Sequence, residues 1–182
     1  DALPYPLYET AGHFLLHRGR IVPLPPALAC WHLSDGYSFG QGSAYHVWAT
    51  RGCPHRCAYC CNSFYAELYP GWNCVRRQSN QRIVDEIRSM RAQMPFIDRV
   101  AFMDDTFFAA PLETIREFSA LYKAQIDLPF FACASPATLD APRLEALVAA
   151  GLRHGWGGMQ SGSDRIQDIY RRHTPPRLLT ET

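Results

Sequence analysis

The chain has a single lysine, a nearly balanced charge and no long apolar segment. Its 18 basic residues are arginines except for Lys123, and the formal net charge is +1. This balance indicates neither a nucleic-acid partner nor an anionic membrane surface. The first residues, Asp1-Ala2-Leu3, lack the basic and apolar regions of a secretory signal, and no apolar run is long enough to span a membrane. These absences favour a cytoplasmic protein that contacts neither a membrane nor nucleic acid.

The composition is that of a folded domain, and both ends of the sequence suggest a longer protein. Hydrophobic residues make up 47% and charged residues 19% of the 182 positions, which is ordinary for a globular chain with its own core. The sequence begins with Asp1 in place of methionine and ends at Thr182, shortly after an expected helix and the Pro175-Pro176 pair. We therefore expect a fragment whose C-terminal structural units are missing.

The cysteines are odd in number and unevenly spaced. Four of the seven fall between Cys53 and Cys61. A secreted scaffold held by disulfides would be shorter, denser in cysteine and more evenly spaced. The distribution therefore indicates a reducing compartment in which thiolates serve as metal ligands. The full set is Cys30, Cys53, Cys57, Cys60, Cys61, Cys74 and Cys133.

Two regions differ in their sequence pattern. Residues 1–44 are rich in proline and aromatic residues and show no sustained period, so we expect an irregular lead-in or connector. Residues 45–182 alternate between short apolar segments and amphipathic segments, which predicts strand–helix units, a parallel sheet and the α/β class. The expected strands cover residues 45–49, 100–103, 130–133 and 154–159, and the expected helices cover 62–69, 81–94, 163–172 and the segments after Pro111 and Asp140.

Local signals set the expected ends and faces of two helices. Asn80 and Asp140 are the expected N-caps, because their side chains can accept hydrogen bonds from the first turn. Gly151 is expected to end the helix after Asp140. Leu147 and Val148 are expected to face the core from that helix.

Polar side chains follow each of the expected strands. The cysteine group, the pair Asp104-Asp105, Ser135 and the pair Gln160-Ser161 each come directly after one of them. In parallel α/β sheets the carboxyl ends of the strands and the loops that follow hold the chemistry. We therefore expect these residues to converge at one edge of the sheet.

The central segment reads Cys53-Pro54-His55-Arg56-Cys57-Ala58-Tyr59-Cys60. These short gaps let one loop wrap three thiolates around an iron–sulfur cubane and leave the fourth iron without a protein ligand. An open coordination position distinguishes a catalytic metal site from a closed structural one, a rule stated for zinc and extended here to iron.

Two other uses of these cysteines remain open. A structural zinc site needs four ligands, and Cys61, Cys74 or His55 could supply the fourth. A ferredoxin that carries electrons would use four cysteines per cluster in a different spacing. A zinc or iron–sulfur module without catalysis is therefore the second hypothesis beside an enzyme.

The segment Cys53 to Cys60, preceded by an expected strand and by Arg51-Gly52, resembles the signature of the radical S-adenosylmethionine superfamily. The resemblance covers residues 45–182 and implies a partial (β/α)6-type barrel whose C-terminal strands are missing here. It implies that Cys53, Cys57 and Cys60 bind a 4Fe–4S cluster and that S-adenosylmethionine chelates the open iron. It also implies a one-electron donor, such as flavodoxin or ferredoxin, and reductive cleavage to a 5′-deoxyadenosyl radical that abstracts hydrogen from the substrate.

The resemblance further suggests which residues contact S-adenosylmethionine. Tyr59 is the aromatic residue usual before the third cysteine, and either Asp104 or Asp105 is expected to accept hydrogen bonds from the amino group. Each of these aspartates could instead be a loop or helix-cap carboxylate. Ser135, Gln160 and Ser161 are the other expected cofactor contacts, and Gln160 stands where relatives more often carry glutamate.

Three segments resemble members of the superfamily that are associated with cobalamin. These are the Pro-rich lead-in, residues 157–166 and Tyr170 to Pro175. The resemblance implies a cobalamin-dependent methylation or rearrangement, with cobalamin bound by a domain outside this chain. A cobalamin-free methylthiotransferase or oxidoreductase of the same superfamily is the alternative. The substrate, a small molecule or a peptide, is left open by the sequence.

Overall fold

A four-stranded parallel sheet forms the centre of the chain. The computed structural model describes residues 1–7, 11–32, 34, 42–69, 71, 75–172 and 174. The strands lie in the order β3 (Ala44–Val47), β6 (Arg99–Phe102), β7 (Phe130–Ala134) and β8 (Leu152–Gly157), and each neighbouring pair is parallel. The α/β class with a parallel sheet is confirmed, and the sheet matches the expected partial barrel.

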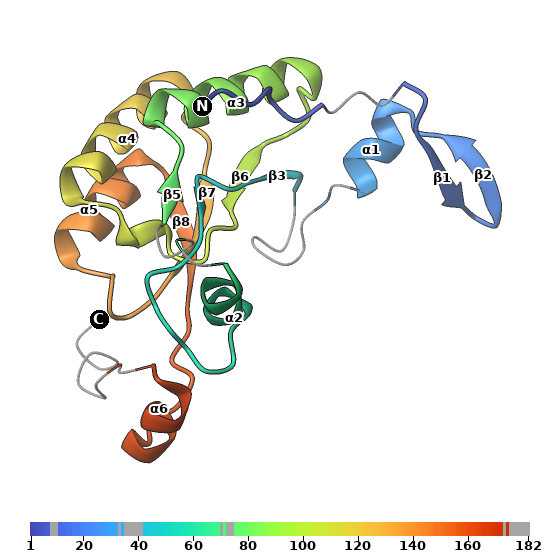
Figure 1. The fold of residues 1–182 in the computed structure, drawn as a ribbon. Coiled ribbons are helices and arrows are strands. Elements are labelled where there is room, and N and C mark those ends of the chain that lie inside the picture. The colour runs from blue at the N-terminus through green and yellow to red at the C-terminus, as the bar shows by residue number, and fades with distance from the viewer. Residues whose placement is uncertain are drawn as a thin grey trace.

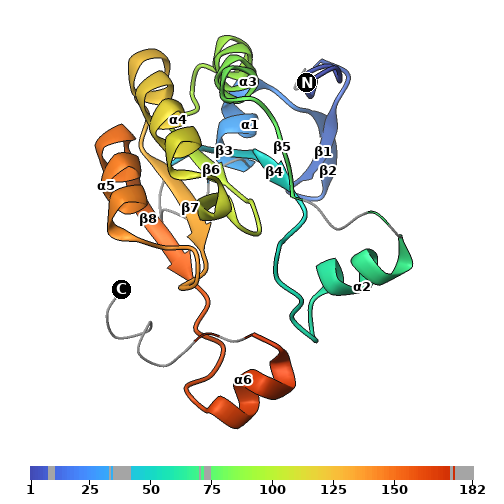
Figure 2. The same ribbon diagram turned by 60° about the vertical axis from the view of Figure 1, so that its left-hand side comes forward.

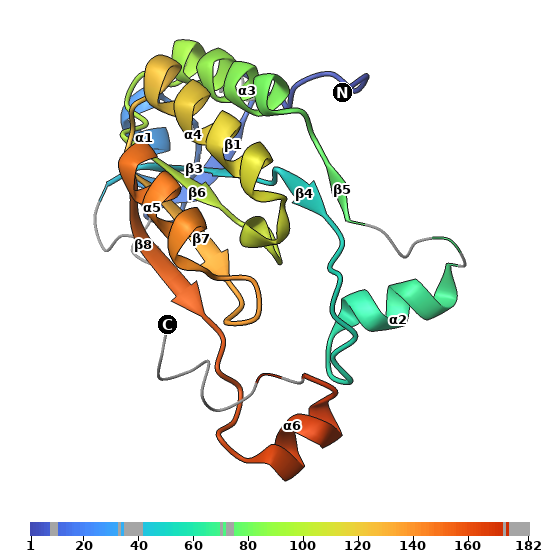
Figure 3. The same ribbon diagram turned by 90° about the vertical axis from the view of Figure 1, so that its left-hand side faces the viewer.

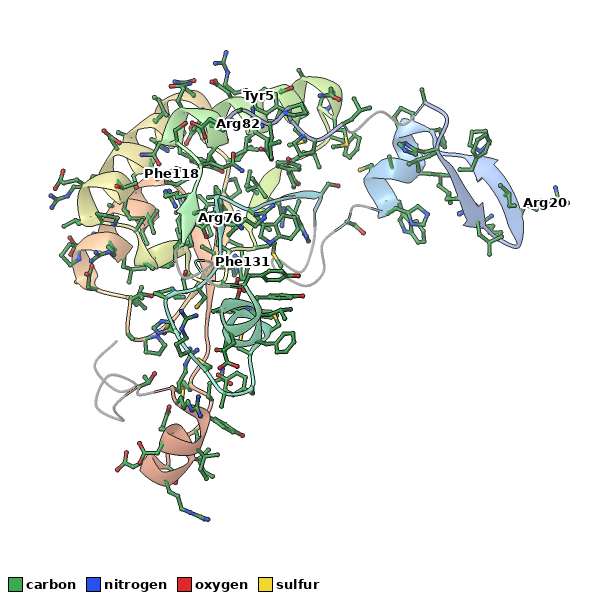
Figure 4. The ribbon with its side chains drawn as sticks, viewed as in Figure 1. Tyr5, Arg20, Arg76, Arg82, Phe118 and Phe131 are labelled. Carbon is green, nitrogen blue, oxygen red and sulfur yellow. The ribbon has the colours of Figure 1, made fainter. Side chains whose placement is uncertain are left out.

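Three helices cover one face of this sheet (Figure 1). They are α3 (Asn80–Gln93), α4 (Leu112–Gln125) and α5 (Ala141–Ala150). Phe102 on β6 lies in the core between them, and its ring contacts the rings of Phe107, Phe118, Tyr122 and Phe130. Strand alternation turns the intervening residues to the other face, where a small apolar cluster of Ala44, Ala101 and Phe131 is found. In Figure 4 Phe118 lies in the helix layer and Phe131 lies on the sheet.

The expected helix ends are partly confirmed. Asp140 caps α5 and accepts from the backbone N–H of Arg143 at 2.9 Å. Gly151 ends α5 with φ +129, where a Cβ atom would lie 2.9 Å from the carbonyl oxygen of Leu128. Asn80 is not the cap of α3. Ser79 takes that position, because Asn80 is already helical and donates its side-chain amide to the Thr114 carbonyl.

Val148 was wrongly assigned to the core. Its side chain is 47% exposed, whereas Leu147 beside it is fully buried. Val148 lies with Leu144 in a shallow pocket against β8, which is the outer strand of the sheet in the part of the chain that the structure describes. The prediction therefore failed at an uncovered edge of the sheet.

The lead-in is more regular than expected. It contains an antiparallel hairpin, β1 (Phe14–His17) and β2 (Arg20–Pro23), and a short helix, α1 (Pro26–His32). The prediction of an irregular chain was wrong over this stretch. The two-residue turn Arg18-Gly19 has positive φ at both positions, the geometry that suits a tight hairpin. Arginine at the first turn position is not a usual hairpin signal, which is why the pattern did not reveal it.

The remaining short elements lie beyond the carboxyl ends of the strands. A two-stranded ribbon, β4 (Thr50–Arg51) with β5 (Arg76–Arg77), and helix α2 (Cys61–Leu68) separate β3 from α3. A 3₁₀ turn, η1 (Phe107–Ala109), follows β6, and helix α6 (Asp164–Tyr170) follows β8. Figures 2 and 3 show α2 and α6 standing away from the helix layer, at the end of the sheet to which β7 and β8 point. None of the helices described in the structure is long and apolar enough to cross a membrane.

Candidate functional site

The cysteine loop leaves the sheet through β3 and the β4–β5 ribbon. Gly52 has φ +94 and turns the chain immediately before Cys53, a conformation that other residues rarely adopt. Cys57 is 4% exposed, while Cys53 and Cys60 are half-buried. The loop is closed by the N–H of Cys60, which donates to the Cys57 carbonyl at 3.1 Å, and by the Ser63 hydroxyl, which donates to the same carbonyl at 2.8 Å.

The Cys53 thiol lies close enough to Cys57 and Cys60 for their charges to affect its pKa. Burial raises the pKa of the Cys53 thiol, and the nearby Asp105, Cys60 and Cys57 also raise it, against the opposing effect of a backbone hydrogen bond from His55. The thiol form is therefore favoured until a cation is present to stabilise the thiolate. Among the residues that the structure describes, no three His, Cys, Asp or Glu side chains converge closely enough to hold one metal ion. A cubane binds each thiolate through a different iron, so three thiols spread along one loop fit its donor requirement.

Cys61 and Cys74 were the alternative fourth thiols for a zinc site. Cys61 directly follows Cys60, is the first residue of α2 and is exposed. Cys74 lies outside the described residues. His55, the third alternative, is part of the loop, and burial together with the nearby Arg172 lowers its pKa.

Asp104 is buried behind the cysteine loop. It is 1% exposed, and its carboxylate accepts from the backbone N–H groups of Ala49 and Thr50 and from the Thr50 hydroxyl. Burial raises the pKa of this carboxyl group, against the opposing effect of these donors and of Arg77. Asp104 thus fixes the chain between β3 and the cysteines, and its oxygens are occupied by the protein's own donors.

Asp105 is exposed on the opposite side of the same turn. Its Oδ2 accepts from the side-chain amide of Asn62 at 3.0 Å, and the same amide nitrogen lies 3.7 Å from the Cys60 sulfur. Asp105 therefore lies beside the cysteine loop with an accessible carboxylate. The sequence left the choice between Asp104 and Asp105 open, and their surroundings now distinguish them.

The residues after β7 and β8 approach the loop to different extents. Ser135 is buried, and its hydroxyl lies 3.5 Å from Nη2 of Arg172. Gln160 is exposed with φ +62, and the Ser161 hydroxyl accepts from the N–H of Ser163 at 3.1 Å. Among the described residues, no hydrogen bond joins Gln160 or Ser161 to a cysteine. All four strands point the same way, so the expectation that these segments share one edge of the sheet is confirmed.

Three side chains at the site were not predicted from the sequence. Asn62 bridges Cys60 and Asp105, as described above, and Arg172 contacts Cys57 through Nη1 at 3.6 Å. The ring of Tyr170 packs edge-on against Tyr59 with centroids 5.0 Å apart. Asn62 carried no signal except its place after the last cysteine. Arg172 and Tyr170 fall in the Tyr170–Pro175 segment, whose resemblance assigned them no role.

The structure thus combines a parallel α/β sheet with a three-cysteine loop beyond the carboxyl ends of its strands. The sequence model of the radical SAM superfamily matches residues 49–180 of the chain. The chain therefore belongs to the radical SAM superfamily and is an enzyme.

Individual relatives agree with this family. The chain is 22% identical over 174 residues to an uncharacterized methyltransferase of Pyrococcus horikoshii, covering 96% of this chain and 34% of the relative. The chain thus spans about a third of that relative's length. It resembles the cobalamin-dependent S-adenosylmethionine radical enzyme OxsB, with aqua-cobalamin and S-adenosylmethionine bound, at 18% identity and a TM-score of 0.60 over 75% of this chain and 21% of that one.

A second solved structure gives the same result. The radical S-adenosylmethionine methyltransferase TsrM from Kitasatospora setae, with cobalamin and a [4Fe-4S] cluster bound, is 20% identical with a TM-score of 0.58. The match covers 71% of this chain and 25% of that one. At these identities the likeness establishes the fold, and what those proteins bind is known for them alone.

Proposed function

We propose that Cys53, Cys57 and Cys60 hold a 4Fe–4S cluster and that the chain cleaves S-adenosylmethionine reductively at its open iron. The observation that carries the proposal is the spacing of these three thiols on one loop at the carboxyl edge of the sheet. When bound, the cluster would supply one electron to the sulfonium group, whose bond to the 5′ carbon would break to give methionine and a 5′-deoxyadenosyl radical for hydrogen abstraction.

Different residues of the chain would hold the cluster and S-adenosylmethionine. The three cysteines supply thiolates, and Asp104 keeps the loop in place through Ala49 and Thr50. Asp105 is the carboxylate that remains accessible beside the loop. We therefore assign it the role of accepting a charge-assisted hydrogen bond from the amino group of S-adenosylmethionine.

Four further residues remain proposed contacts to S-adenosylmethionine. Tyr59 lies on the cysteine loop, and Ser135 is joined to that loop through Arg172. Gln160 and Ser161 lie on the β8–α6 loop, where their side chains could reach a nucleoside that extends from the cysteine loop.

The reaction that we favour is a cobalamin-dependent methyl transfer, with rearrangement as the other cobalamin-dependent outcome. It is supported by a methyltransferase relative and by two solved structures whose descriptions name cobalamin. Cobalamin would be bound by a domain outside this chain, and flavodoxin or ferredoxin would donate the electron. The substrate would be a small molecule or a peptide. A methylthiotransferase or oxidoreductase without cobalamin is the second candidate, since residues 160–163, Gln-Ser-Gly-Ser, resemble a segment also common in methylthio-transferring members.

The experiment is anaerobic reconstitution followed by exposure to S-adenosylmethionine and dithionite. We expect about four iron and four sulfide per chain, a visible iron–sulfur absorption band and release of 5′-deoxyadenosine. Cys60→Ala should abolish all three, whereas the neighbouring Cys61→Ala is the matched control and should retain them. Stoichiometric zinc without sulfide would replace the proposal with a structural metal module. A cluster that never cleaves S-adenosylmethionine would indicate an electron-relay module.

A further inference from the structure

Arg172 reaches three separate segments at the site. Its Nη1 lies 3.6 Å from the sulfur of Cys57, and its Nη2 donates to the Gly158 carbonyl at 3.1 Å and lies 3.5 Å from the Ser135 hydroxyl. One guanidinium therefore joins the cysteine loop to the segments that follow β7 and β8. The planar guanidinium, with several donors in a fixed arrangement, makes these contacts at once.

The position of Arg172 is fixed from both sides. Arg171 has φ +51 and ends α6, and the backbone N–H of Arg172 donates to the Gln167 carbonyl at 3.0 Å. The end of α6 is joined to the cysteine loop by the N–H of Ala58, which donates to the Tyr170 carbonyl at 2.8 Å. The guanidinium is thus directed at Cys57 by the backbone around it.

Cys57 differs from Cys60 in the charge of its neighbour. The neutral amide of Asn62 lies beside the Cys60 sulfur, whereas the cationic guanidinium of Arg172 lies beside the Cys57 sulfur. Cys57 is also the buried thiol of the three, and a charge acts more strongly where water is excluded.

We propose that Arg172 is a positioning residue that donates a charged hydrogen bond to the Cys57 thiolate and raises the reduction potential of the cluster. The proposal rests on the cluster assigned above. Reduction adds a negative charge to the cluster, and a cation that donates to one of its sulfurs stabilises the reduced state more than the oxidised state. The cluster is then easier for an electron donor to reduce.

The test compares substitutions at two adjacent arginines in the reconstituted chain without S-adenosylmethionine. Arg172→Met removes the contact with Cys57, Arg172→Gln keeps a neutral donor, and Arg172→Lys keeps the charge. Arg171→Met is the matched control, because Arg171 is exposed and its loss removes the same charge from the same segment. Midpoint potentials are measured by redox titration followed by electron paramagnetic resonance, with iron and sulfide counted for each variant.

At a fixed ambient potential, Arg172→Met should lower the ratio of reduced to oxidised cluster about tenfold, which corresponds to about 59 mV for one electron. Arg172→Gln should give most of this change, and Arg172→Lys and Arg171→Met about threefold or less. A normal cluster with an unchanged ratio in Arg172→Met would overturn the proposal. If Arg172→Met holds no iron, Arg172→Gln and Arg172→Lys decide, and equal potentials in these two variants would overturn it. A wild-type chain without iron and sulfide would instead refute the proposed function itself.

Discussion

The helix layer and the cysteine side of the sheet are built in different ways. Helix α3 buries Ile83, Val84, Ile87 and Met90 against the strands, whereas α2 buries no residue and α6 buries only Gln167. The helix layer is held by apolar packing. The cysteine loop and helices α2 and α6 are held by a few polar contacts, chiefly those of Asp104, Asn62 and Arg172.

The region that stabilises the fold is therefore distinct from the region that carries the candidate site. Segments with little buried apolar surface open at lower free energy than a packed core, so the cysteine loop and α6 should be the less stable part of the molecule. A cluster bound by three thiolates on that loop would add its binding free energy to the same region. Substitutions in the two regions should therefore produce different measurable effects.

Phe102→Ala should have the largest effect on folding. Phe102 is fully buried and contacts four aromatic rings, so its truncation should lower the free energy of unfolding by about 3–5 kcal/mol. Phe64→Ala on α2 is the control, because that ring is 60% exposed, and it should change the free energy by no more than about 0.5 kcal/mol. Urea unfolding of the metal-free chain measures both. A cost at Phe64 equal to that at Phe102 would mean that α2 belongs to the core after all.

Asp104 and Asp105 test the division within one turn. Asp104→Asn should lower the free energy of unfolding by about 1–3 kcal/mol, because one of the two oxygens that accept from Ala49 and Thr50 is replaced by an amide group that only donates. Asp105→Asn should leave stability unchanged and weaken binding of S-adenosylmethionine to the reconstituted protein. Urea unfolding and equilibrium binding under anaerobic conditions distinguish the two. The reverse result, with Asp105 needed for folding and Asp104 for binding, would contradict the assignment.

The sequence predicted the parts of this molecule that depend on local pattern. The short apolar segments around Val100 and Phe130 were predicted to be buried strands and are paired in the sheet, and parallel strands bring the segments after them to one edge of the sheet. The distinction between Asp104 and Asp105 could not be predicted, because it depends on Thr50, which pairs with Asp104 across 54 positions of sequence. The contact of Arg172 with Cys57 spans 115 positions and leaves no periodic signal in either segment.

Asp104 and Asp98, at opposite ends of β6, should affect the pH dependence of folding with opposite signs. Burial raises the pKa of Asp104 in the folded chain, so between the unfolded value, about 3.9, and the folded value the folded state binds more protons. Its contribution to stability is therefore full below the unfolded pKa and is lost as pH rises through the folded pKa. Unfolding of the wild type and of Asp104→Asn across this pH range measures that term as their difference.

Asp98→Asn should have the smallest effect. A hydrogen bond from Arg99 lowers the pKa of Asp98, and the N–H of Ser43 also donates to this carboxylate, at 3.1 Å. The contribution of Asp98 is therefore present above the unfolded pKa and is lost as pH falls through the folded pKa. Since the Asp98 side chain is 54% exposed, the substitution should cost no more than about 1 kcal/mol at neutral pH, and added salt should reduce the cost. Unfolding at pH 7 and pH 3, with and without salt, measures it. A cost that grew on acidification would show that Asp98 is held in its protonated form, and the two ends of β6 would then respond to pH in the same way.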